Sequence, residues 1–251
     1  MFNLSGKTAL VTGAGQGVGA EIASALARFG AAVAVNDLSL DRAEESAQHI
    51  RAAAGTASAV VADVTDMDAV NAMVAQVERT LGPVDILVNN AGLPASGMPL
   101  ATFAESTPSD WDAVLQINIH GVLHCCHAVL PRMTARGWGR IINISSDSGR
   151  TGEARMAVYS ASKAAGAGFS RSLAKEVGED GITCNTLSLG TILPPTVPAN
   201  DARLTNHRRR YPARRLGSPN DIAGAVIWLA SDAGSWVTGQ TIPVNGGYST
   251  S

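Results

Sequence analysis

The sequence predicts an α/β protein with a single, doubly wound Rossmann-type parallel sheet of about seven strands and helices on both faces. Two observations support this fold class. Short apolar runs alternate with segments of helical periodicity along the chain, without a break in composition. The first apolar run, at 8–12, leads directly into a glycine-rich turn at 12–19 that opens a helix. We therefore expect residues 1–251 to form one domain.

The composition describes a soluble chain with a substantial core, since 45% of the 251 residues are hydrophobic and 16% are charged. A net charge of −2 favours neither nucleic acid nor a membrane surface as a partner. Cys125, Cys126 and Cys184 offer no metal-binding spacing and no even disulfide set, which favours a cytoplasmic setting. We expect no signal peptide, and no membrane span because no apolar run approaches about 20 residues.

The glycine-rich turn predicts a dinucleotide site. Glycines let the backbone approach a pyrophosphate closely, and the amides that open the following helix favour its negative charge. A second buried strand, Ala32–Asn36, then ends at Asp37, about twenty residues beyond the glycines. The residues of this region expected to contact the cofactor are Gly13, Gln16, Gly17, Val18, Gly19, Asp37 and Leu38.

Asp37 indicates the type of cofactor. An acidic side chain at this position can accept hydrogen bonds from the adenosine ribose hydroxyls and would repel a 2′-phosphate. Neither Gln16 nor Leu38 supplies a cation that could hold such a phosphate. The sequence therefore predicts NAD rather than NADP.

The later elements continue the alternation of strand and helix. In a parallel sheet of this kind ligands bind beyond the carboxyl ends of the strands, and Asp63, Asn89 and Asn90 fall at that edge. The predicted strands are Ala57–Ala62, Asp85–Val88, Arg140–Ser145 and Thr183–Leu187, and the predicted helices are Asp41–Ala53, Asp66–Leu81, Ser109–Arg136 and Pro219–Ala230.

The long helix at 109–136 raises the question of a metal site. His120, His124 and His127 fall on one face of it, and Cys125 and Cys126 lie between them. No second pair of ligands approaches from a neighbouring motif. We therefore predict that this face serves packing or a subunit contact, and we expect no metal.

Tyr159 and Lys163 indicate where the chemistry lies. Residues four apart share a helix face, so the ammonium can sit beside the phenol. Two unit charges about 4 Å apart interact by about 4 kcal/mol at an effective dielectric of about 20. This energy would lower the pKa of the phenol by about three units, toward neutral pH. Many helices carry such a pair by chance, so the prediction depends on the rest of the chain.

Five features in order give the chain a resemblance to a known family. They are Thr-Gly-x-x-x-Gly-x-Gly at 12–19, Asn-Asn-Ala-Gly at 89–92, Asn118, Ser146 and Tyr-x-x-x-Lys at 159–163. Together they resemble the short-chain dehydrogenase/reductase family, in the group with a single Rossmann-type domain, over essentially the whole chain. The resemblance implies one NAD(P)-binding domain over residues 1–251.

The resemblance also implies the roles of four residues. Tyr159 would be the general acid/base, and Lys163 would lower the pKa of its phenol and hold the nicotinamide ribose. Ser146 would hydrogen-bond the substrate oxygen, and Asn118 would hold a water that links Lys163 to solvent. Further cofactor contacts are expected from Asp63, Val64, Asn90, Ala91, Gly92, Gly190 and Ile192.

The chain departs from the family pattern in the segment that commonly holds the nicotinamide carboxamide. Leu189 and Pro194 stand where the family usually has Pro and Thr. The backbone near Ile192 can still bind the carboxamide. A side-chain hydroxyl contact is either missing or comes from Thr191 or Thr196.

Three segments are expected to surround the substrate, namely loops at 93–109 and 147–158 and a lid at 189–215. The lid is rich in arginine against the single acid Asp201. It could hold an anionic substrate, such as a carboxylate or the phosphates of a coenzyme A thioester. A solvated or subunit-pairing cluster is the alternative. The arginines are Arg203, Arg208, Arg209, Arg210, Arg214 and Arg215.

The leading interpretation is an NAD-dependent dehydrogenase/reductase acting on a secondary alcohol and its ketone, with alicyclic, steroid and hydroxyacyl-CoA compounds as candidate substrates. One alternative is an NADP-dependent 3-oxoacyl or ketone reductase. Another is a non-catalytic, NAD-sensing scaffold, which the intact site residues argue against. A homotetramer, common in the family, is consistent with small residues on the Tyr159 helix, namely Ala161, Ala164, Ala165 and Gly168.

Overall fold

The computed structural model describes residues 1–93, 97, 100–194, 197–198 and 201–250, and its centre is a seven-stranded sheet. The strand order is β3-β2-β1-β4-β5-β6-β7, and the paired strands are parallel. The predicted fold class is confirmed, and the predicted strand ends agree within two residues. The strands are β1 (Thr8–Val11), β2 (Ala32–Asp37), β3 (Thr56–Val61), β4 (Val84–Asn89), β5 (Gly139–Ser146), β6 (Ile182–Leu189) and β7 (Thr241–Val244).

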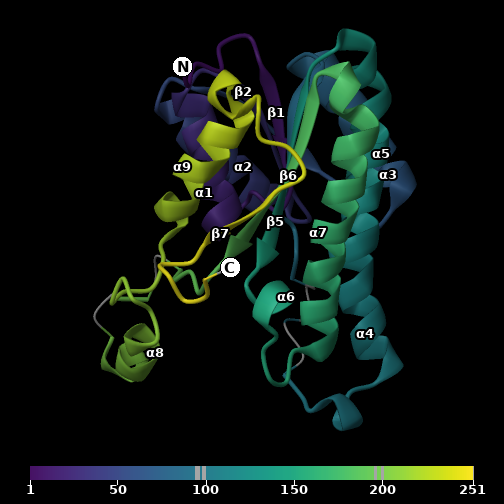
Figure 1. Cartoon of the computed structure of the whole chain (residues 1–251). Coiled ribbons are helices and arrows are strands. Elements are labelled where there is room, and N and C mark those ends of the chain that lie inside the picture. The colour runs from purple at the N-terminus through teal and green to yellow at the C-terminus, as the bar shows by residue number, and fades with distance from the viewer. Residues whose placement is uncertain (94–96, 98–99, 195–196, 199–200, 251) are drawn as a thin grey trace.

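Helices cover both faces of this sheet (Figure 1). Helices α1 (Gly17–Arg28), α2 (Leu40–Ala52) and α9 (Pro219–Ala230) pack on one face. Helices α3 (Met67–Thr80), α5 (Gly121–Arg136) and α7 (Ala157–Val177) pack on the other. Side chains of successive strand residues point to opposite faces, so Ala9 and Val11 enter the first apolar cluster while Leu10 enters the second. Because both faces are covered, central strands such as β1 and β4 are buried on both faces and do not alternate between exposed and buried residues.

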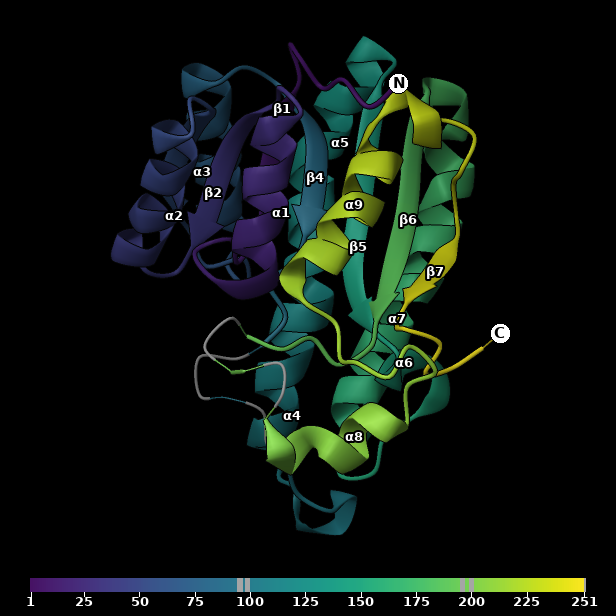
Figure 2. The same cartoon turned by 90° about the vertical axis from the view of Figure 1, so that its left-hand side faces the viewer.

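Two short helices lie beyond the carboxyl ends of the strands, α6 (Ser148–Thr151) and α8 (Thr205–Arg209). Figure 2 shows α8 beneath the lower ends of β5 and β6, on the side of the sheet edge where ligands bind in folds of this type.

The predicted long helix is confirmed, with one unpredicted feature. Helix α4 (Pro108–Leu115), a π-helical turn at Gln116–His120 and α5 follow one another without a break. Such turns accommodate an extra residue and occur frequently at functional sites. The run Pro108–Arg136 is long and apolar enough to cross a membrane by length and composition alone, a test that the core helix of a soluble protein also passes. In the fold its buried side chains, including Cys125 and Met133, belong to the apolar core beside β4 and α3.

Thr12 and Asn90 join the ends of β1 and β4. The Thr12 hydroxyl accepts hydrogen bonds from the backbone amides of Asn90 (3.0 Å) and Ala91 (3.1 Å). The Asn90 side-chain amide donates to the carbonyl oxygens of Thr12 (2.9 Å) and Gly13 (3.0 Å). These contacts hold the glycine turn against the loop that follows β4.

Replacing Asn90 by alanine should lower the free energy of unfolding, since the Thr12 and Gly13 carbonyl oxygens would lose the Asn90 side-chain donor. An unmet buried hydrogen-bonding group costs about 1–3 kcal/mol, and we expect a loss of this size in urea denaturation. Asn71→Ala, on the exposed side of α3, is the matched control and should change stability by less than about 0.5 kcal/mol. Equal changes in the two variants would contradict the role given to Asn90.

Candidate active site

A cleft of about 700 Å³ opens at the carboxyl edge of the sheet, where the strand order reverses between β1 and β4. It is lined by residues of the glycine turn, the end of β2, the loops after β3 and β4, helix α7 and the segment after β6. Every residue predicted to contact the cofactor lines it. They are Gly13, Gln16, Gly17, Val18, Gly19, Asp37, Leu38, Asp63, Val64, Asn90, Ala91, Gly92, Tyr159, Lys163, Gly190 and Ile192.

The glycine turn has the close backbone packing that a dinucleotide site requires. Gly13 and Gly17 both have φ of 60°, a region that side chains other than glycine rarely adopt. A Cβ added to Gly19 would lie 2.4 Å from the Gly13 carbonyl oxygen. Gln16 precedes α1 without a side-chain hydrogen bond to the helix amides. The turn and the start of α1 therefore fit a pyrophosphate.

Asp37 is buried at the adenosine end of this cleft and has a partner that the sequence did not predict. Its carboxylate accepts hydrogen bonds from Nε (3.1 Å) and Nη2 (2.6 Å) of Arg42, in the first turn of α2. Arg42 also lines the cleft. A cation therefore stands beside Asp37, although neither Gln16 nor Leu38 provides one. The signal in the sequence was an arginine in the first turn of the helix after Asp37.

Tyr159, Lys163 and Ser146 come together as the sequence predicted. Tyr159 and Lys163 lie on α7, and the Lys163 Nζ is 5.6 Å from the centroid of the Tyr159 ring. Ser146 at the end of β5 lines the same cleft as Tyr159 and acts to lower the pKa of the Tyr159 hydroxyl. The Ser146 oxygen also accepts hydrogen bonds from the amide (3.2 Å) and hydroxyl (3.0 Å) of Ser148, to which the sequence assigns no role. These two bonds occupy the lone pairs of the Ser146 oxygen. Toward any further group the Ser146 hydroxyl can therefore act only as a donor.

The predicted lowering of the Tyr159 pKa is wrong for these residues on their own. Burial raises the pKa of Tyr159, and the hydrogen bond from Ser146 opposes this only in part. Burial also lowers the pKa of Lys163 to about 8. The Lys163 Nζ donates to the Ile144 carbonyl oxygen at 3.2 Å and lies beside the ring of the tyrosine. Desolvation is therefore the main cause of the pKa shift of both groups.

Asn118 lies on the π-helical turn, buried near Lys163. Neither atom of its side-chain amide has a hydrogen-bond partner among the described residues. A Cβ added to Gly92 would lie 3.1 Å from the Asn118 Oδ1 and 2.6 Å from the Lys163 Nζ, so both polar atoms face the same backbone. A buried amide without a partner is suited to holding a water or a ligand atom.

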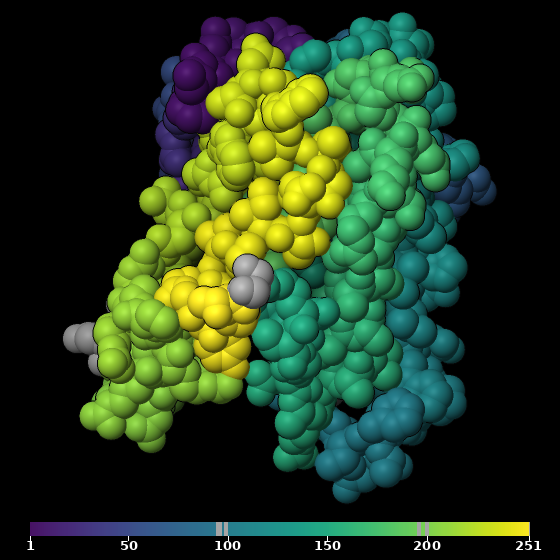
Figure 3. Space-filling view, viewed as in Figure 1, coloured from purple at the N-terminus to yellow at the C-terminus, as the bar shows by residue number. Residues whose placement is uncertain are grey.

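A second pocket of about 650 Å³ adjoins the cleft and is lined from all three segments expected to surround the substrate. Figure 3 shows a hollow between the α8 segment and the side of α6 and α7. The two cavities share Ser146, Tyr159, Leu189 and Gly190. The described lining of the second pocket is Leu100, Ser146, Asp147, Ser148, Glu153, Ala154, Arg155, Met156, Tyr159, Leu189, Gly190, Thr191, His207, Arg210, Tyr211 and Tyr248.

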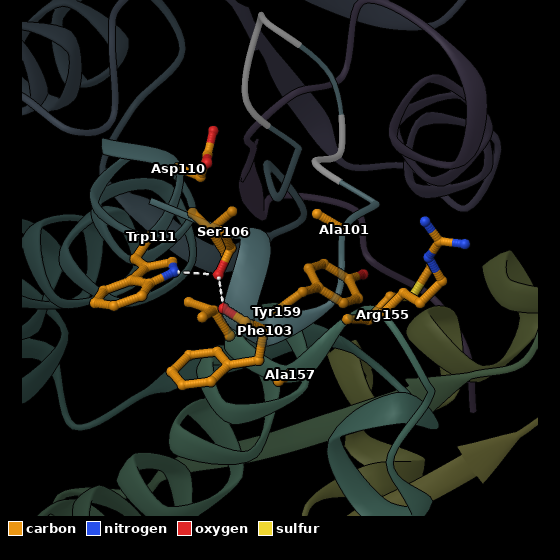
Figure 4. Close-up of a pocket in the computed structure, with 11 residues that line it drawn as sticks. Ala101, Phe103, Ser106, Asp110, Trp111, Arg155, Ala157 and Tyr159 are labelled. Atoms are coloured by element: carbon orange, nitrogen blue, oxygen red, sulfur yellow. Dashed lines mark hydrogen bonds between the residues drawn. The ribbon is translucent and has the colours of Figure 1, made fainter. Parts of the chain in front are cut away.

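A small apolar cavity of about 30 Å³ lies on another side of Tyr159 (Figure 4). Phe103 and Trp111 stack with their ring centroids 5.3 Å apart, and the Trp111 indole donates to the Ser106 hydroxyl at 2.7 Å. These groups and Arg155 lie around Tyr159 in this view. The loop before α4 therefore forms one wall of this cavity, opposite Tyr159 and Arg155.

Three of the six lid arginines contact lid residues, and a fourth pairs with α9. Arg203 pairs with Asp201 at 2.6 Å, and Arg215 pairs with Asp221 at 2.7 Å. Arg208 donates to the Asp201 carbonyl oxygen at 2.9 Å, and Arg214 donates to that of Arg209 at 3.3 Å. Arg210 is the lid arginine among the described residues that lines the second pocket, and it packs over the Tyr248 ring.

The Thr191 hydroxyl, in the segment after β6, is bound by other residues of the lid. The Thr191 hydroxyl contacts the His207 Nε2 at 2.9 Å and the Tyr211 hydroxyl at 3.0 Å. Of the two hydroxyls that the sequence offered for the carboxamide, Thr191 is therefore engaged with the lid, and Thr196 lies outside the described residues. Ile192 lines the cleft, so its backbone stays the candidate contact.

On the histidine face of the long helix His124 packs against the fold, whereas His120 and His127 are exposed. His124 Nδ1 contacts the Val64 carbonyl oxygen at 3.1 Å, and Cys125 and Cys126 are buried. Burial raises the pKa of Cys125 to about 12, so its thiol is unreactive at neutral pH. Within the described part of the chain, no group of three or more His, Cys, Asp or Glu residues could hold a metal ion.

A parallel sheet with a glycine turn where its strand order reverses, and a Tyr–Lys pair facing that turn, is the architecture of a Rossmann-fold oxidoreductase. A family model described as enoyl-(acyl carrier protein) reductase matches residues 13–249. The chain is 43% identical to nodulation protein G of Azospirillum brasilense, over 97% of this chain and 98% of that protein. It is 40% identical to the acetoacetyl-CoA reductase of Shinella zoogloeoides, over 96% and 98%.

Among solved structures, a gluconate 5-dehydrogenase from Burkholderia cenocepacia, in complex with NADP and tartrate, superposes with a TM-score of 0.90. It is 36% identical, and the match covers 98% of this chain and 96% of that one. The chain therefore belongs to the short-chain dehydrogenase/reductase family, as its motifs predicted.

The protein without cofactor should show no ionisation of Tyr159 near neutral pH, because burial raises the pKa of this phenol above its ordinary value of about 10. Ultraviolet difference titration of the wild type against Tyr159→Phe isolates this group from Tyr211 and Tyr248. The difference signal should have its midpoint above about pH 10. A midpoint near neutral pH would contradict the dominance of desolvation.

Proposed function

We propose that this chain is an NAD-dependent oxidoreductase that transfers a hydride between a secondary alcohol or its ketone and the nicotinamide ring. One observation carries the proposal. The dinucleotide cleft and the second pocket meet at Ser146 and Tyr159, so a substrate carbon and a nicotinamide can face each other beside both hydroxyls. The bound cofactor supplies the hydride chemistry and, when oxidised, a positive charge.

Tyr159 exchanges the proton of the substrate hydroxyl, and Ser146 donates to the same oxygen where negative charge develops. Ser148 supports this by occupying the acceptor sites of the Ser146 oxygen, so that its proton points away toward Tyr159 or the substrate. Lys163 holds the ribose hydroxyls next to Tyr159 and favours its ionised form. The unpartnered amide of Asn118 holds a water on the path between Lys163 and solvent.

NAD is favoured because a buried carboxylate, Asp37, faces the position of the adenosine ribose. The gluconate 5-dehydrogenase with a TM-score of 0.90 was solved with NADP, so an NADP-dependent ketone or 3-oxoacyl reductase is the second candidate. The cation of Arg42 beside Asp37 is the feature of this chain that favours it.

The substrate is a compound small enough for a pocket of about 650 Å³ with a polar and aromatic wall. Arg210 and Arg155 both line that pocket, and either can hold a carboxylate or phosphate of the substrate. The other lid arginines with described polar contacts bind lid residues or a neighbouring helix, so the proposal assigns the anionic group to Arg210 or Arg155 rather than to them.

The protein is a cytoplasmic homotetramer in this proposal. The small residues Ala161, Ala164 and Ala165 are exposed on α7, where the helix of a second copy can approach closely. An apolar groove over α5 and α7, lined by residues such as Leu130 and Phe169, continues this surface. The three cysteines are free thiols, buried in the fold, which suits a reducing compartment.

Replacing Tyr159 by phenylalanine should lower kcat by about 10²–10⁴-fold with any substrate found in a panel of hydroxyacyl-CoAs, hydroxysteroids, cyclic alcohols and hydroxy acids, since general acid/base catalysis contributes that much. NAD binding, measured by fluorescence titration, should change little. Ser160→Ala is the control, because Ser160 adjoins Tyr159 and lines neither cavity. Unchanged turnover in Tyr159→Phe would refute the mechanism.

Replacing Asp37 by alanine together with Leu38→Arg should shift the ratio of kcat/KM for NAD and NADP toward NADP. Hydrogen bonds to a charged group contribute about 1.5–3 kcal/mol, which corresponds to a shift of about 10- to 100-fold. The comparison needs initial rates with both cofactors on one substrate. An unchanged ratio would remove Asp37 as the determinant of cofactor choice.

A further inference from the structure

Both oxygens of the Asp37 carboxylate accept hydrogen bonds from groups of the protein itself, and Oδ1 is the more heavily engaged. Oδ1 accepts from the Ser39 amide (3.0 Å) and from Nε and Nη2 of Arg42, and Oδ2 accepts from the Gly15 amide (3.2 Å). A carboxylate offers about four acceptor sites. With about two sites on each oxygen, Oδ1 is fully occupied and Oδ2 keeps one site, so a ribose hydroxyl that is to donate to Oδ1 must displace one of its donors.

Arg42 is the donor that can leave. The amides of Gly15 and Ser39 belong to the glycine turn and to the start of α2, and both are held by the backbone. The side chain of Arg42 is 46% exposed, whereas that of Asp37 is 7% exposed. The Arg42 stem is packed, because a Cβ on Gly15 would lie 2.7 Å from the Arg42 Cβ, so movement is confined to the guanidinium end.

Arg42 also changes what a 2′-phosphate meets in this cleft. Asp37 alone would repel it, but the Asp37–Arg42 pair carries no net charge. A guanidinium has five N–H donors, and Nε and Nη2 face Asp37, which leaves donors free for a phosphate. Among the described residues that line the cleft, Arg42 and Lys163 are the lysines and arginines, and Lys163 lies beside Tyr159 rather than Asp37.

We propose that Arg42 is a cofactor-specificity residue that opposes Asp37. It stays on Asp37 and donates to the 2′-phosphate when NADP binds, and it competes with a ribose hydroxyl for Oδ1 of Asp37 when NAD binds. The chain then favours NAD but accepts NADP, and Arg42 sets the ratio of its affinities for the two cofactors. This inference rests on the proposed use of a nicotinamide dinucleotide.

Binding of two adenosine fragments tests the proposal without turnover. Isothermal titration of the full-length protein with 2′,5′-ADP, which carries the 2′-phosphate, is compared with 5′-AMP, which carries both ribose hydroxyls. Arg42→Ala should weaken 2′,5′-ADP by about tenfold or more, the effect of one charge-assisted hydrogen bond. Binding of 5′-AMP should stay equal or tighten, since its hydroxyls no longer compete with the guanidinium. Arg42→Gln keeps the aliphatic stem and should behave in the same way.

Arg51→Ala is the matched control. Arg51 lies at the other end of α2, pairs with Glu44 and does not line the cleft, so its loss removes the same charge without the same contact. It should alter neither affinity. The proposal is overturned if wild-type protein does not bind 2′,5′-ADP, if Arg42→Ala and Arg42→Gln leave its affinity unchanged, or if both fragments weaken equally. These outcomes do not depend on catalysis, so they are separate from the Tyr159→Phe test.

Discussion

The buried ammonium of Lys163 is the interaction on which the arrangement of the site depends. It is 8% exposed, and its Nζ donates to the Ile144 carbonyl oxygen near the end of β5. The loop after β4 closes over it because Gly92 has no side chain. One cation therefore fixes β5, α7 and this loop relative to one another. Burial destabilises the charged form of Lys163 and lowers its pKa to about 8. The protonation of this group is therefore sensitive to any charge that enters the cleft.

Asp147 is a second anchor, next to Ser146 in the chain. Its buried carboxylate accepts hydrogen bonds from the Ser188 hydroxyl (2.6 Å), the Asn245 amide (2.5 Å) and the Ser249 hydroxyl (3.1 Å). The last residues of the chain are thereby tied to the ends of β5 and β6. This contact places Tyr248 at the wall of the second pocket. The shape of the second pocket thus depends on the buried carboxylate of Asp147. In the sequence this residue is marked only by its position next to Ser146.

Most of the fold and of the candidate site could be predicted from local sequence. Apolar runs and helical periodicity located the strands and helices, because burial against a two-sided sheet imposes those patterns. The parallel order then placed Gly13, Asp37, Asn90 and Ser146 at one edge, since strands of that order end on the same side. The π-helical turn that carries Asn118 could not be predicted, because its extra residue leaves no distinct pattern in the sequence.

The sequence by itself determined the sheet, the glycine turn and the spacing that sets Tyr159 and Lys163 on one helix face, since each follows from local periodicity and residue type. The tertiary structure decided the direction of the Tyr159 pKa shift and the charge balance around Asp37. Whether the Tyr159 pKa rises or falls depends on burial by distant segments. Whether Asp37 stands alone or with Arg42 depends on how the first turn of α2 is oriented relative to the end of β2. Charge balance and desolvation are properties of contacts in space, and a linear pattern does not record them.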